Sequence, residues 1–97
     1  MSDATPAPRI RRDARLRWDT REQKFLLLYP ERGLLLNAAA HAVVELCDGE
    51  HSPENMAEAL AARYAPGNPA ELLPFVRSFL DRLRGLGLIE NAEKSWS

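Results

Sequence analysis

The sequence predicts an α+β domain in which a three-stranded antiparallel sheet is followed by three α-helices. Three short apolar segments, separated by turn residues, lie between Arg15 and Leu36. The second half holds three helix-capping residues, and two of them precede a proline that suits the first helical turn. With 97 residues, of which 45% are hydrophobic, the chain is long enough for one domain and too short for two.

The strands are predicted from alternation and from turn residues. Residues 15–19 alternate polar and apolar side chains, which is typical of a half-buried strand. The run Phe25–Tyr29 suits a strand or a helix by pattern alone, but Pro30 ends it at a length typical of strands. A turn over Pro30–Gly33 leads to a third strand at Leu34–Leu36, and connections this short predict an antiparallel meander.

Each predicted helix begins at a capping residue and ends at a helix-breaking one. The caps are Asn37, Ser52 and Asn68, and the helices that follow them cover residues 38–47, 53–64 and 69–86. The terminating segments are Asp48–Gly49, Ala65–Gly67 and Gly87. Apolar side chains of the second helix recur every four residues, at Met56, Leu60 and Tyr64.

The two ends are expected to lie outside the folded domain. Residues 1–8 predict a disordered tail, because two prolines and small polar side chains nucleate no structure. The domain itself covers residues 9–90, with Leu88 and Ile89 packing back on the core. Residues 91–97 form a polar C-terminal tail.

Composition and charge exclude several classes of protein. The single cysteine excludes an internal disulfide. No apolar run approaches a signal peptide or the ~20 residues of a membrane span, so we expect a cytoplasmic protein without membrane contact. The 13 Lys and Arg against 14 Asp and Glu argue against a general nucleic-acid binder, although seven of the basic side chains lie in residues 1–24.

Residues that could carry chemistry are few. His41, His51 and Cys47 are too few and too dispersed for a zinc site. Cys47 lies between Glu45 and Asp48, whose charges would raise its pKa, so we expect a small buried side chain and not a nucleophile. The sequence therefore predicts no catalytic residue, no metal and no cofactor, and the protein is not expected to be an enzyme.

The third helix carries an unusually broad apolar stripe. Its members follow a four-three spacing, widened by two more side chains: Leu72, Val76, Phe79, Leu83 and Leu86, with Phe75 and Leu80. Two interpretations stay open. The helix is either simply well buried in a small domain, or one margin of its stripe, at Phe75 or Phe79, borders an apolar groove.

A small antiparallel sheet with three helices, two of them joined by a short turn, is winged-helix-like, which makes a DNA-binding regulator the alternative function. The third helix would have to read DNA, yet Glu71 is the only charged side chain in its segment Pro69–Phe75. An acidic helix start repels phosphate and disfavours this alternative. The basic segment Arg9–Arg17 keeps it open as a phosphate-binding arm.

Five segments stand in a characteristic order and spacing: Arg15–Asp19, Leu27–Glu31, Leu35–Asn37, Leu46–Gly49 and Gly87–Ile89. Together they resemble the PqqD family, the small peptide-binding proteins of pyrroloquinoline quinone (PQQ) biosynthesis. The resemblance covers residues 9–90. The segment Asn37–Ala40 departs mildly, with alanine where the family would have Pro or Glu and Thr.

The resemblance implies a winged-helix-like peptide-recognition domain without catalysis. Such a protein binds the ribosomal precursor peptide, whose Glu and Tyr become the cofactor, and presents it to a radical S-adenosylmethionine enzyme that carries iron–sulfur clusters. The peptide would lie as an added strand beside the third strand, against the third helix. The implied peptide-binding residues are Leu34, Leu35, Leu36, Phe75, Val76, Phe79 and Leu83. Similar domains occur in other peptide-modifying systems, so a non-catalytic subunit of such an enzyme is a further alternative.

The residues support strand addition independently, because a short sheet with an open edge can accept another strand and the broad helix stripe can supply pockets. The same open edges invite a second copy of the chain. We therefore expect a concentration-dependent homodimer that competes with the peptide for one edge.

Overall fold

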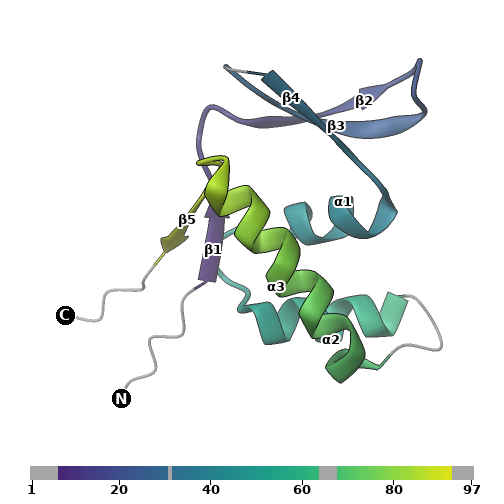
Figure 1. The fold of residues 1–97 in the computed structure, drawn as a ribbon, viewed down its shortest axis with the longest axis vertical. Helices are drawn as coiled ribbons and strands as arrows, with labels where there is room; N and C mark the ends of the chain where they lie inside the picture. Colours follow the sequence, from purple (N-terminus) through teal and green to yellow (C-terminus); the bar gives the residue numbers. More distant parts are fainter. Residues whose placement is uncertain (1–6, 31, 64–67, 93–97) are drawn as a thin grey trace.

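The predicted meander is the larger sheet of the protein (Figure 1). The computed structural model describes residues 7–30, 32–63 and 68–92. Strands β2 (Arg15–Asp19), β3 (Lys24–Tyr29) and β4 (Arg32–Leu36) pair antiparallel in the order β2-β3-β4. The ambiguous apolar run is thus a strand, and β4 forms one edge of the sheet.

Three helices follow, as the caps predicted: α1 (Ala38–Glu45), α2 (Pro53–Arg63) and α3 (Pro69–Gly85). The Asn37 side chain accepts a hydrogen bond from Ala40 N at 2.8 Å, and Asn68 does the same for Ala70 N at 2.9 Å. The α1 helix ends two residues earlier than expected, with Leu46 as its C-terminal cap. Tyr64 and the predicted break at Ala65–Gly67 lie outside the described residues.

The end of α3 has the hydrogen bonds of a glycine-terminated helix. Gly87 N donates to Arg84 O at 3.0 Å, and Leu88 N donates to Leu83 O at 2.9 Å. Gly87 has a φ of 73°, which a residue with a side chain rarely adopts. This turn reverses the chain, so that Leu88 enters the core fully buried.

A second, two-stranded sheet corrects the predicted tails. Strand β1 (Ala7–Ile10) pairs antiparallel with β5 (Ile89–Ala92), from Ala7 opposite Ala92 to Ile10 opposite Ile89. Ala7 and Pro8, assigned to the disordered tail, are buried, and β5 runs two residues into the predicted polar tail.

The other side of β1 is held by the segment after α1. Ile10 N donates to Cys47 O at 3.0 Å, and Gly49 N donates to Pro8 O at 2.9 Å. Gly49, with a φ of 82°, therefore shapes the connection that meets β1, although the sequence suggested that it ends the helix. The tail boundaries were wrong because this pairing joins residues about 80 positions apart, which no local pattern reveals.

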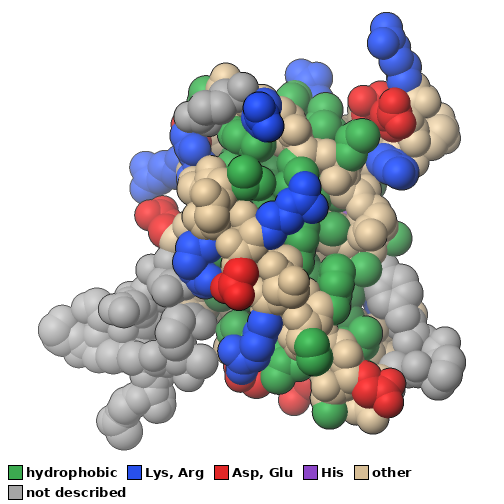
Figure 2. All heavy atoms as spheres, in the orientation of Figure 1, with side chains coloured by type: hydrophobic (Ala, Val, Ile, Leu, Met, Phe, Trp, Pro, Cys, Tyr) green, Lys and Arg blue, Asp and Glu red, His purple; other side chains and the backbone are tan. Residues whose placement is uncertain are grey.

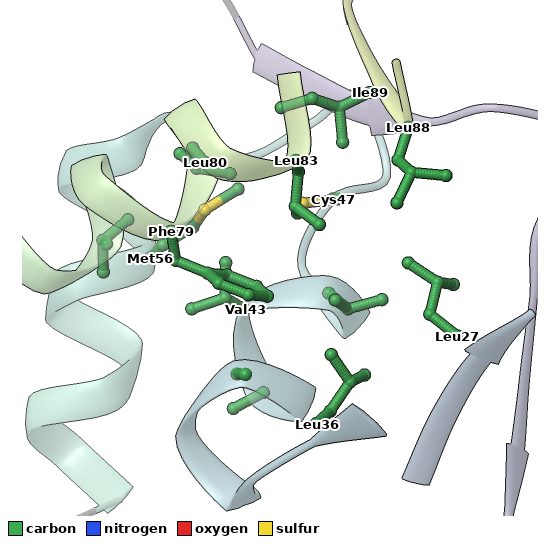
Figure 3. Packing of buried hydrophobic residues seen from close by; sticks show 14 of the residues in the cluster. Leu27, Leu36, Val43, Cys47, Met56, Phe79, Leu80, Leu83, Leu88 and Ile89 are labelled. Carbon is green, nitrogen blue, oxygen red and sulfur yellow. The ribbon is translucent and has the colours of Figure 1, made fainter. Parts of the chain in front are cut away.

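One hydrophobic core lies between the larger sheet and the helices (Figure 3). Val43 of α1 lies at its centre and is fully buried, with Leu27 and Leu36 of the sheet on one side and Phe79 and Leu83 of α3 on another. All three helices lie on the same side of the larger sheet (Figure 1). Within the described part of the chain, no helix is long and apolar enough to cross a bilayer.

Candidate functional site

Strand β4 offers a free backbone edge. Its one neighbour is β3, with Tyr29 opposite Arg32 and Leu26 opposite Leu35, and no described strand pairs with its other edge. The two-residue connection between β3 and β4 closes on a hydrogen-bonded pair, and antiparallel pairs alternate from there. The N–H and C=O of Gly33 and Leu35 therefore point away from β3, toward the open edge.

The side chains of β4 divide between the two faces of the sheet. Leu36 is 2% exposed and belongs to the core, and Leu34 packs against that core half-buried. Leu35 points to the opposite face and is 45% exposed. The three consecutive leucines predicted to bind peptide thus have different roles, because side chains alternate along a strand.

On α3, the residues at the centre of the apolar stripe are buried in the core. Val76 and Leu83 are fully buried, and Leu80 faces α2 near Met56 (Figure 3). On the opposite flank, Phe79, Leu86 and Phe75 lie about 60°, 80° and 100° around the helix from Val76. This second set, Phe75, Phe79 and Leu86, is called the α3 margin below.

The structure separates the two phenylalanines that the sequence left undecided. Phe79 is 9% exposed and points toward Val43 in the core (Figure 3). Phe75 is only half-buried and stacks on Phe79, with the ring centroids 6.2 Å apart and the planes 5° from parallel. Phe75 is therefore the ring that borders solvent, and Phe79 is the ring that supports it.

Hydrophobic side chains form a band on the face of the molecule that carries α3. Figure 2 shows the band running from the larger sheet down along α3. Leu34, Leu36, Phe75, Val76, Phe79 and Leu83 all join one cluster, the buried ones as members and the half-buried ones packed on it. Of the predicted site residues, Leu35 alone stands apart. Leu86, 39% exposed on the α3 margin, was absent from the predicted set although its place at the end of the stripe indicated it.

The side chains that could act as a nucleophile, a base or a ligand are buried, hydrogen-bonded or stacked on an aromatic ring. Burial first, and the charge of Asp48 second, raise the pKa of the Cys47 thiol to about 12, so it stays protonated at neutral pH. Partial burial opposes ionisation of Asp48, but hydrogen bonds from His51 and Glu50 N outweigh it and lower its pKa. His41 lies flat against Phe25, with the ring centroids 3.8 Å apart.

Within the described ranges, no three or more His, Cys, Asp or Glu side chains lie close enough together to hold a metal ion. The arrangement described so far suits the binding of an extended apolar segment, through a backbone edge and a neighbouring band of hydrophobic side chains.

This chain is similar to a known protein family and to curated proteins. A family model described as "Coenzyme PQQ synthesis protein D (PqqD)" matches residues 24–89. The "PqqA binding protein" of Methylococcus capsulatus is 33% identical over 75 residues, which cover 77% of each chain. The "PqqA binding protein" of Rhodopseudomonas palustris strain TIE-1 is 33% identical over 91 residues, covering 94% of this chain and 88% of the relative.

A solved structure shares the fold. It is the solution NMR structure of the PqqD truncation of Methylobacterium extorquens PqqCD, described as a functional, stand-alone recognition element for ribosomally synthesized and post-translationally modified peptides. The two chains superpose with a TM-score of 0.74 at 34% identity, over 86% of this chain and 87% of that one.

Proposed function

Since this chain belongs to the PqqD family, we propose that it binds PqqA, the precursor peptide of PQQ, and presents it to a radical S-adenosylmethionine enzyme. The observation that carries the proposal is the open edge of β4 beside the band of hydrophobic side chains that reaches the α3 margin. The protein then acts as an adaptor and performs no catalytic step itself. The buried, protonated Cys47 thiol supports this non-catalytic role.

The peptide adds to β4 as a fourth strand in this proposal. Hydrogen bonds to the N–H and C=O groups of Gly33 and Leu35 set its register, and they are indifferent to the peptide's side chains. Specificity comes from apolar peptide side chains that enter the seam between Leu34 and Phe75. Burying one such side chain contributes about 1.5–3 kcal/mol.

The direction of the backbone groups gives a sharp test. Leu35→Pro removes an N–H that points to the open edge, so the β3–β4 pairing survives while strand addition is lost. Leu34→Pro, its matched control, removes an N–H that points to β3 and should lower thermal stability. Isothermal titration calorimetry with the PqqA peptide of the same genome, together with thermal melts, should show at least about tenfold weaker binding for a folded Leu35→Pro variant. Unchanged peptide affinity in that variant would refute strand addition at β4.

The open edge also bears on self-association. We propose that a second copy pairs with β4 and that saturating peptide dissociates this homodimer, because both need the same backbone groups. Light scattering across a concentration series, with and without PqqA, tests the competition. A dimer that persists unchanged with bound peptide contradicts it.

A winged-helix DNA regulator is the alternative function. Here α3 would enter DNA, but Glu71 is the acidic residue of its first turn and Phe75 follows. Exposed Arg15 and Arg17 are the observation in favour of DNA. A gel-shift titration with generic duplex DNA at low salt distinguishes the two, since tight and strongly salt-dependent binding would favour the regulator.

A further inference from the structure

The larger sheet has a second face that no described helix covers. Strand register assigns eight residues to it: Arg15, Arg17 and Asp19 of β2, Lys24, Leu26 and Leu28 of β3, and Gly33 and Leu35 of β4. Arg15, Leu28 and Gly33 form one row across the sheet, and Arg17, Leu26 and Leu35 form the next. This surface is called the outer face below.

The centre of the outer face is apolar. A Cβ atom added at Gly33 would lie 3.1 Å from Leu26 Cδ1 and 3.3 Å from Leu28 Cδ2, so both leucines lean over the glycine. Leu26 and Leu28 are only half-buried, and neither packs against the hydrophobic core. With Leu35 at 45% exposure, they form an apolar patch separate from the core.

One side of this patch carries positive charge. Arg15 and Arg17 are exposed, and neither has a carboxylate partner among the residues that the structure describes. The acidic residue at the far end of the face, Asp19, already accepts hydrogen bonds from Arg21 N at 2.9 Å and Glu22 N at 3.2 Å. A second copy packed on this face would offer these arginines no free carboxylate, so the face does not suit self-association.

The outer face continues onto a peptide bound at β4. A strand added there lies about 4.8 Å from β4, and its side chains opposite Gly33 and Leu35 project to the same face. A protein on the outer face would therefore touch the domain and alternate side chains of the peptide together. That arrangement suits the enzyme that must recognise the loaded domain.

We propose that the outer face docks the peptide-modifying enzyme, through an apolar contact at Leu26, Leu28 and Leu35 and a carboxylate-bearing surface that pairs with Arg15 and Arg17. The inference rests on the proposed function, because it takes the peptide to lie along β4. Binding of peptide and enzyme to one domain is then cooperative, since each adds surface for the other.

Two charge reversals with the same change in net charge test the docking face. Arg17→Glu alters the outer face, and Arg12→Glu alters an exposed position in the loop between β1 and β2. Binding to the radical S-adenosylmethionine enzyme encoded in the same genome is measured with and without PqqA. Arg17→Glu should weaken enzyme binding about tenfold or more, Arg12→Glu should change it less than about threefold, and both should keep wild-type peptide affinity. Leu26→Ser, which removes the apolar centre, should also weaken enzyme binding.

Three results would overturn the inference. Equal loss in both reversals would indicate long-range steering without a docking face. Unchanged enzyme binding in Arg17→Glu and Leu26→Ser, with intact peptide binding, would place the enzyme elsewhere. The face would be assigned to a membrane by a third result. In that case the wild-type protein binds anionic phosphatidylglycerol vesicles, and Arg17→Glu abolishes this binding but leaves enzyme binding intact. Failure of the proposed function is separate, because the wild-type protein would then not bind PqqA at all.

Discussion

Phe79→Ala should mainly lower the stability of the domain, whereas Phe75→Ala should mainly weaken peptide binding, although the two rings stack on each other. Phe79 is 9% exposed and fills the core, where Phe→Ala substitutions cost about 3–5 kcal/mol. A domain of this size has a total stability of about 5–15 kcal/mol, and each kcal/mol lost lowers Tm by about 4–8 °C. Phe79→Ala should therefore lower Tm by at least about 12 °C.

Phe75→Ala should spare most of that stability and lose the peptide instead. Its ring is half-buried, so we expect a loss of only about 1 kcal/mol in the free energy of unfolding. A peptide side chain that packs on this ring would lose about 1.5–3 kcal/mol, which is a ten- to a hundredfold rise in Kd. Leu73→Ala, on the flank of α3 that lies opposite the α3 margin, serves as the matched control and should bind peptide normally.

Thermal melts and peptide titrations of these three variants check the reasoning together. The groove assignment would be refuted if Phe75→Ala bound PqqA like the wild type, or if Leu73→Ala lost as much affinity as Phe75→Ala. A Phe79→Ala variant that melted like the wild type would refute the assignment of that ring to the core.

Two further predictions concern stability and reactivity. Gly87→Ala should lower the free energy of unfolding by about 1 kcal/mol, because the φ of 73° strains any residue with a side chain. Gly85→Ala should raise it by up to about 1 kcal/mol, because Gly85 lies in helical backbone and an added Cβ would meet open space. Chemical denaturation that gave both changes the same sign would contradict this. Cys47 should resist thiol reagents in the folded protein at pH 8 and react at once in denaturant. The free energy of unfolding should be independent of this thiol below pH 9 and should fall between pH 9 and about 12, because the thiol ionises in the unfolded chain but not in the native protein over that range.

The sequence predicted those elements whose signals are local. Asn37 and Asn68 mark helix starts, Gly87 marks a helix end, and Pro30 decided between strand and helix for the run before it. Strand β1 has no such signal, since Ala7–Ile10 contains a proline and shows no alternation. Its pairing with β5 forms only when the whole chain has folded around the core.

The candidate site, too, could be predicted only where its signal is local. The apolar stripe of α3 indicated its margin, but angular spacing alone could not decide which phenylalanine faces the core, because that depends on where α1 packs. The outer face was missed for another reason. The run Phe25–Tyr29 is apolar at every position and hides the alternation that separates Leu26 and Leu28 from the core residues beside them.

The antiparallel pairing of β1 with β5 has an architectural consequence. Ala7 and Ala92 are register partners, and such residues have Cα atoms about 4.5–5.5 Å apart. Figure 1 shows this pair of strands away from the larger sheet, so the first residue of β1 and the last residue of β5 lie together on one side of the domain. A domain so arranged can be tethered to another protein at either end, or inserted into its loop, while the β4 edge stays clear of the junction. The attachment point and the working surface are thus built from different sheets.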